Sequence, residues 1–185
     1  MIKDLLEDAK RRMAKSVKNF QAEIAKIRTG RASVALVDSI KVDYYGTVMP
    51  LNQMATITVA DARLIVIQPW DPSALGAIEK AIQRSDLGLS PTNDGKVIRI
   101  AVPPLTEERR KELVKMVRKM AEEARVAVRN IRRDVLDDLK ELKKEGEISE
   151  DDFYRAQDQL QKITDEYIGK IDQILEEKEK DIMTI

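Results

Sequence analysis

The chain has 185 residues, 36 % of them charged, a formal net charge of zero, and neither cysteine nor histidine. Without cysteine there can be no disulfide, thiolate zinc site or thiol nucleophile, and the lack of histidine removes the commonest general base and metal ligand. Charged residues break up the N-terminus and no apolar run approaches membrane-spanning length, so a soluble cytoplasmic protein is expected.

An amphipathic helix is predicted over residues 2–28. Its apolar side chains recur at three- and four-residue steps, which places them on one face: Leu6, Met13, Val17, Phe20, Ile24 and Ile27. Gly30 is predicted to end this helix, because glycine accepts the left-handed conformation of a helix C-terminus.

The next 70 or so residues favour strands. Apolar and polar residues alternate over 40–44, a return strand follows at 47–51, and further strands are predicted at 55–59, 64–67 and 97–102. The continuous apolar run at 64–67 indicates a strand buried on both faces. A helix over 73–85 is predicted to start at Asp71 and Pro72. The strand at 64–70, this helix and the strand at 97–102 suit either a right-handed βαβ unit or a mixed sheet, and the strand order stays open.

A long helix over residues 105–144 follows, with Thr106 as its predicted N-cap and Gly146 just beyond its end. About 40 residues at 1.5 Å each make a rod of roughly 60 Å. One face carries an apolar stripe: Leu113, Val117, Met120, Ala124, Val128, Ile131, Val135, Leu139 and Leu142. Another face carries a basic stripe that Glu122 interrupts: Lys111, Lys115, Arg118, Arg125, Arg129 and Arg132.

Ser149 is predicted to cap a third amphipathic helix. The short turn before it makes the second and third helices antiparallel. The predicted class is therefore α+β, with a discontinuous three-helix bundle (1–30 and 105–185) and an inserted β-rich domain (31–104). Two thin connections near 29–33 and 101–105 suggest a hinge, to which we assign Thr29, Gly30, Pro103, Pro104 and Leu105.

Charge is unevenly distributed along the chain. The net charge is +5 over residues 1–33, −1 over 34–104, +5 over 105–133 and −9 over 134–185. Arg125, Arg129, Arg132 and Arg133 fall within one sector of the long helix, and several arginine forks together can track a phosphate backbone. The competing interpretation is a solvated face paired with nearby acids: Glu122, Glu123, Asp134 and Asp137. Because aromatic stacking platforms are lacking, folded RNA fits better than single strands.

Enzymatic chemistry has little support in the sequence. Adjacent acids such as Glu122 and Glu123 point about 100° apart on a helix, which suits surface charges better than a catalytic pair. The phosphate-binding pattern Gly-x-x-x-x-Gly-Lys-Ser/Thr is absent. We therefore predict no catalytic residue, no metal site and no cofactor.

Several multi-residue blocks, in order along the whole chain, resemble the ribosome recycling factor family. The blocks are RTGRAS at 28–33, VDYYG at 42–46, PLTEERR at 104–110, VRNIRRD at 128–134 and EISEDD at 147–152. This resemblance implies an L-shaped protein of the size of a tRNA, with a three-helix bundle as the long arm and a hinged β/α/β sandwich as the short arm.

The resemblance also implies a function. Members of the family act with elongation factor G and its GTP hydrolysis to split ribosomes into subunits after termination, and the bundle binds large-subunit rRNA. By resemblance the rRNA-contacting positions are Arg28, Gly30, Arg31, Arg129, Arg132 and Arg133, and the basic stripe adds Lys115, Arg118 and Arg125. A monomer without membrane contact is expected. The alternative is a stand-alone coiled-coil interaction module or chaperone, which would show an exposed hydrophobic seam.

Overall fold

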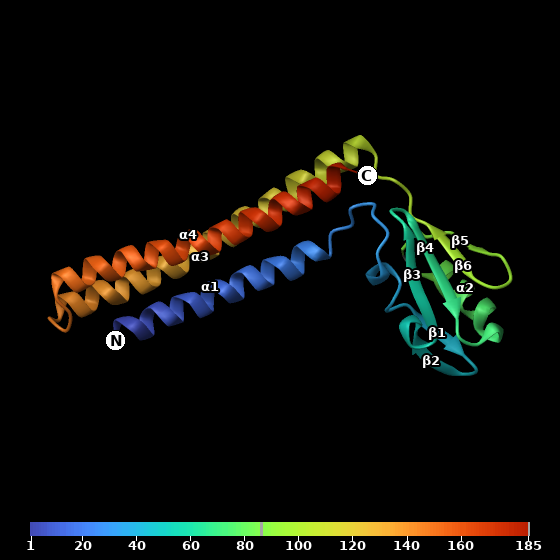
Figure 1. Ribbon diagram of the computed structural model, residues 1–185, viewed down its shortest axis with the longest axis horizontal. Helices are drawn as coiled ribbons and strands as arrows, with labels where there is room; N and C mark the ends of the chain where they lie inside the picture. The colour runs from blue at the N-terminus through green and yellow to red at the C-terminus, as the bar shows by residue number, and fades with distance from the viewer. Residues whose placement is uncertain (86, 185) are drawn as a thin grey trace. The chain divides into compact units, whose positions relative to one another are not determined.

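A computed structural model describes residues 1–85 and 87–184 (Figure 1). Contacts divide the described chain into two compact units. The bundle unit comprises Met1–Arg28 and Glu107–Thr184, and the small unit comprises Thr29–Thr106. Each unit has buried apolar side chains of its own, so each can be described as a separate body.

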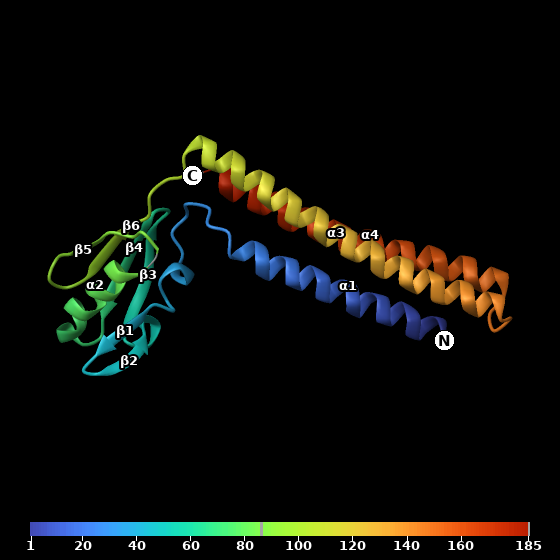
Figure 2. The same ribbon diagram turned by 180° about the vertical axis from the view of Figure 1, so that it is seen from behind.

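The bundle unit consists of three helices: α1 (Ile2–Ala25), α3 (Glu107–Lys144) and α4 (Glu150–Met183). Helix α3 runs antiparallel to α1 and to α4, and all three helices contact one another (Figures 1 and 2). The predicted stripes form the core, because side chains at three- and four-residue steps meet along the helix axes. Met13, Val117, Val135, Leu139 and Ile171 are fully buried in it.

Both predicted signals around the α3–α4 connection are confirmed. Gly146 has a φ of +73°, and the N–H of Glu147 donates to the carbonyl of Leu142 at 2.9 Å, which together end α3 in a Schellman motif. The Ser149 hydroxyl accepts a hydrogen bond from the N–H of Asp152 at 3.0 Å and so caps α4.

The prediction for the end of the first helix is wrong. Helix α1 stops at Ala25, where Lys26 in the right-handed conformation bonds back to Glu23, so Gly30 lies outside the helix. Gly30 nevertheless has a φ of +78°, in the left-handed region that favours glycine. A Cβ at this position would lie 3.1 Å from Cγ of Leu105, so the close approach of the two connecting segments favours glycine.

Two antiparallel sheets make up the small unit, with helix α2 (Leu75–Arg84) packed alongside them. Strands β1 (Lys41–Tyr44) and β2 (Thr47–Pro50) form a hairpin. The larger sheet has the order β3-β4-β6-β5, with β3 at Ala55–Asp61, β4 at Leu64–Pro69, β5 at Pro91–Asn93 and β6 at Ile98–Ala101. The class predicted from the sequence, α+β with a three-helix bundle and an inserted β-rich domain, is confirmed.

Neither predicted arrangement of the sheet is correct. Strand β4 pairs with β6 antiparallel, not as the parallel partner that a βαβ unit or a mixed sheet requires. The reason is β5, a short strand that is not among those predicted from the sequence, which adds one more reversal of the chain before β6. Strand β4 is also not buried on both faces, because Ile65 and Ile67 are fully buried whereas Val66 is half-buried and Gln68 exposed.

Both connecting segments enter the small unit at the same turn. The N–H of Ala32 donates to the carbonyl of Ala62 at 2.7 Å, and the N–H of Val102 donates to the carbonyl of Arg63 at 2.8 Å. Ala32 and Val102 are both buried. The turn between β3 and β4 therefore anchors the entry and the exit of the chain side by side.

Candidate nucleic-acid interface

All six basic residues predicted for the interface on the long helix lie on α3: Lys115, Arg118, Arg125, Arg129, Arg132 and Arg133. Their surroundings differ. Lys115, Arg118, Arg129 and Arg133 are exposed, whereas Arg125 and Arg132 are half-buried. The six basic residues therefore differ in how far their side chains are exposed to solvent.

Two of these arginines hold α4 through ion pairs. Nε of Arg118 lies 2.6 Å from Oε1 of Glu179, and Nη2 of Arg125 lies 2.8 Å from Oδ1 of Asp172. The hydrogen bond to Glu179 raises the pKa of Arg118. Burial lowers the pKa of Arg125, but its hydrogen bonds to Asp172 and Glu122 outweigh that effect. Both guanidinium groups are thus fixed between helices and only partly available to a ligand.

Glu122 is the acid that interrupts the stripe. Its carboxylate accepts hydrogen bonds from Nη1 of Arg125 at 3.0 Å and from Nη1 of Arg129 at 3.2 Å. These bonds, with that from Arg125 as the larger effect, hold the pKa of Glu122 below its usual range. The charges of this part of the stripe are therefore largely compensated within the bundle.

The remaining cations have no such compensation. Among the residues the structure describes, Lys115, Arg132 and Arg133 form no ion pair. Asp134, the acid next in sequence, instead accepts a hydrogen bond from Nη2 of Arg12 on α1 at 2.9 Å. Arg132 and Arg133 are neighbours in sequence whose side chains point about 100° apart on the helix, so each can take phosphate oxygens separately.

The predicted positions around the connecting segments fall in both units. Arg28 is the last residue of the first bundle segment, and Gly30 and Arg31 belong to the small unit. Arg28 and Arg31 are exposed, whereas Gly30 is buried and has no side chain to offer a ligand. Arg28 follows α1 in the chain, and α1 ends at the end of the bundle where α3 begins (Figure 1). The structure does not bring it together with Arg132.

Reasoning from the sequence missed the acidic side chains that pair with the stripe. It named Glu122 correctly but did not identify Asp172 and Glu179 on α4. It also did not predict that Asp134 pairs with Arg12 of α1. A signal was present, because Asp172 and Glu179 are seven residues apart, as are Arg118 and Arg125. Matching heptad positions on neighbouring antiparallel helices predict such pairs once the two helices are aligned.

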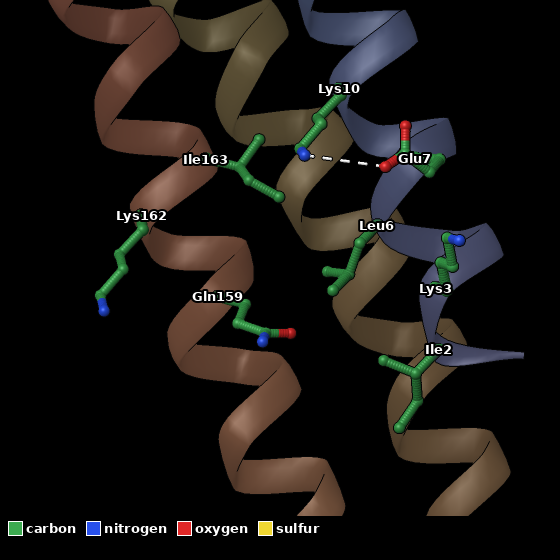
Figure 3. A pocket seen from close by; sticks show the side chains of 8 residues that line it. All are labelled: Ile2, Lys3, Leu6, Glu7, Lys10, Gln159, Lys162 and Ile163. Atoms are coloured by element: carbon green, nitrogen blue, oxygen red, sulfur yellow. Dashed lines mark ion pairs between the residues drawn. The ribbon is translucent and has the colours of Figure 1, made fainter.

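An open groove runs between α1 and the first half of α4, with a volume of about 630 Å³ (Figure 3). Leu6 and Ile163 face one another across it. On its rim, Nζ of Lys10 lies 3.7 Å from Oε1 of Glu7. The groove is short compared with the buried stripes of the three helices. The long exposed seam that the interaction-module alternative requires is absent from the described part of the bundle.

Comparison with known proteins agrees with the resemblance in the sequence. The family model for ribosome recycling factor matches residues 20–183. The ribosome-recycling factor of Halalkalibacterium halodurans is 58% identical over 185 residues, covering 100% of both chains. That of Carboxydothermus hydrogenoformans is 57% identical, again over 100% of both chains. The chain belongs to the ribosome recycling factor family.

Solved structures of the ribosome recycling factor family show the same fold. A solution structure of the ribosome recycling factor matches with a TM-score of 0.74 at 49% identity, covering 100% of this chain and 98% of the other. A second match has a TM-score of 0.65 at 54% identity and covers 99% of both chains. It is the T. thermophilus ribosome recycling factor, described with E. coli elongation factor G bound to the E. coli post-termination complex.

Other kinds of site find no support in the described residues. Within 1–85 and 87–184, no group of three or more acidic side chains is arranged to hold a metal ion. No described helix is long and apolar enough to cross a membrane. The basic surface of α3 thus remains the principal candidate interface.

Proposed function

We propose that this chain binds the post-termination ribosome and, with elongation factor G and GTP, splits it into subunits for a new round of translation. Membership of the family supports the general role. The observation that carries the contact is that Arg132 and Arg133 have no acidic partner among the described residues, whereas Arg118, Arg125 and Arg129 on the same helix pair with acids. Large-subunit rRNA is the proposed ligand, because guanidinium forks match phosphate geometry.

The contributions of the nine proposed rRNA-contacting residues differ. Arg132 and Arg133 make the main phosphate contacts, and Lys115 adds a further exposed cation. Arg129 contributes through the donors that Glu122 leaves unused. Arg118 and Arg125 chiefly hold α4, and Arg28, Gly30 and Arg31 act at the connecting segments.

Replacing Arg132, an open arginine in the sense that it has no acidic partner among the described residues, tests the contact. Arg132→Ala should weaken binding to the large subunit by about 1–3 kcal/mol, or roughly 5- to 150-fold, because a charge-assisted phosphate contact is lost. Arg118→Ala is the matched control on the same helix, since that side chain already pairs with Glu179. Co-sedimentation across a salt series measures both. Equal, small effects of the two variants would show that the open arginines are merely solvated.

The mechanism we propose is a lever. The bundle stays on rRNA while the small unit reorients about the connecting segments that contain Thr29, Gly30, Pro103, Pro104 and Leu105, and elongation factor G pushes on the small unit. Two thin connections between separate cores support this mechanism.

A cross-link between the units tests the lever. Because the chain has no cysteine, one engineered cysteine in each unit can be joined without background labelling. The cross-linked protein should bind ribosomes normally but fail to split them in a light-scattering assay with elongation factor G and GTP. Cleaving the cross-link should restore splitting, and full activity of the locked form would exclude the mechanism.

A further inference from the structure

The ion pairs between α3 and α4 form a ladder with heptad spacing. Arg118 pairs with Glu179 and, seven residues further along α3, Arg125 pairs with Asp172, seven residues earlier on α4. The two helices are antiparallel, so each step forward on α3 matches a step back on α4 (Figure 2). In bundles of this kind, positions one heptad apart lie on the same flank of the helix.

One more step in each direction reaches Arg132 on α3 and Asp165 on α4. The same register places these two residues level with each other, as the third rung of the ladder. No ion pair joins them, and Arg132 has none with any other described residue. The carboxylate of Asp165 instead accepts a hydrogen bond from Nε2 of Gln161, one turn earlier on α4, at 2.9 Å.

Of the carboxylates near this rung, that of Asp165 is the one that could pair with Arg132 in place of an RNA phosphate. The positions one turn away from Arg132 on α3 are Val128, Arg129, Val135 and Leu136, none of which carries a carboxylate. Asp134 is occupied by Arg12. Whether Arg132 is open to a phosphate therefore depends on where the Asp165 side chain points.

We propose that Gln161 and Asp165 are positioning residues for the RNA contact of this protein. By holding the Asp165 carboxylate on α4, Gln161 keeps the third rung open and leaves the Arg132 guanidinium free for an RNA phosphate. This inference rests on the proposed function, because it sets the availability of the same arginine. It adds that two residues of α4, outside the basic stripe, influence the affinity for RNA.

Removing the amide donor tests the proposal. In Gln161→Leu, Asp165 is released to pair with Arg132, and affinity for the large subunit should fall roughly two- to fivefold, the range that an exposed ion pair can supply. In the double variant Gln161→Leu with Asp165→Asn, affinity should return to that of the parent. Gln157→Leu is the matched control, one turn earlier on α4 and without an acidic hydrogen-bond partner among the residues the structure describes.

A measurement without ribosomes separates this inference from the proposed function. A double-mutant cycle of Arg132→Ala and Asp165→Asn, followed by urea unfolding, should give no coupling in the parent and a favourable coupling in the Gln161→Leu background. Absence of coupling in both backgrounds would overturn the inference, even if Arg132→Ala weakens ribosome binding. Coupling without any loss of affinity in Gln161→Leu would overturn it as well.

Discussion

At the scale of single residues, Gly30 and Gly46 form an informative pair. Their φ angles are +78° and +79°, so both backbones occupy the left-handed region that favours glycine. They differ in surroundings. A Cβ at Gly46 would meet nothing within 4 Å, whereas one at Gly30 would lie 3.1 Å from Leu105. The two positions therefore separate the cost of backbone strain from the cost of a crowded side chain.

Replacing each glycine by alanine measures this difference. Gly46→Ala should destabilise the small unit by about 1–2 kcal/mol, the cost of a left-handed residue with a Cβ. Gly30→Ala should cost more, because Leu105 must also move. Urea unfolding of the two variants checks the order. In a Leu105→Ala background the two costs should become similar, and an unchanged difference there would show that Leu105 is not the cause.

Arg132 shows where prediction from the sequence stops at this scale. Its residue type and spacing were enough to place it on the basic stripe. Its open state was not predictable, because that depends on the alignment of α3 with α4 and on the hydrogen bond between Gln161 and Asp165. Pairing across helices depends on contacts that are distant in sequence, whereas the stripe itself is local.

At the scale of elements, the turn between β5 and β6 is organised by one carboxylate. Asp94 accepts hydrogen bonds from the N–H groups of Val97 at 2.9 Å and Lys96 at 3.0 Å, and from the Arg99 guanidinium. These bonds, with the backbone N–H of Val97 as the largest effect, hold the pKa of Asp94 far below its usual range. The charged form of Asp94 therefore stabilises the hairpin that completes the sheet.

This depressed pKa predicts a dependence of stability on pH. Because the folded pKa lies below the unfolded value near 3.9, the unfolded state binds more protons as pH falls below about 4, and stability is lost there. Asp94→Ala should lower the urea midpoint of the small unit at pH 7. At pH 3 the difference between parent and variant should be smaller, and a difference that grows on acidification would contradict the prediction.

The elements were predicted with uneven success for physical reasons. Helix α3 was predicted because its apolar stripe repeats over about eight turns and Gly146 follows its end. Strand β5 was missed, since Pro91, Thr92 and Asn93 show no apolar alternation and pair through their backbones with β6. The order of the larger sheet depended on that missed strand, so a single short element changed the topology.

At the scale of the whole molecule, the two units have separate cores but a shared chain. Trp70 is the only tryptophan in the sequence and lies in the small unit, so its fluorescence reports on that unit alone. The three long helices of the bundle dominate the far-ultraviolet circular dichroism. The two probes can therefore follow the two units separately.

A core substitution in the small unit tests their independence. Ile67 is fully buried there, so Ile67→Ala should destabilise the small unit by about 2–5 kcal/mol through the cavity it leaves. The Trp70 transition should shift by that amount, and the transition at 222 nm should shift much less. Val66→Ala, at a half-buried position on the same strand, is the milder control. Equal shifts of both transitions would mean that the units unfold as one.

The turn at Ala62 and Arg63 also bears on how the bundle folds. Because it fixes the entry and the exit of the small unit side by side, the folded insert joins α1 to α3 as a loop of on the order of ten connecting residues rather than about eighty. Loop-closure entropy grows as (3/2)RT ln n, so this shortening is worth about 2 kcal/mol to the bundle. The folded small unit thus stabilises the bundle by lowering the entropic cost of closing the loop between α1 and α3. Prior folding of the insert should therefore hasten the docking of α1 onto α3.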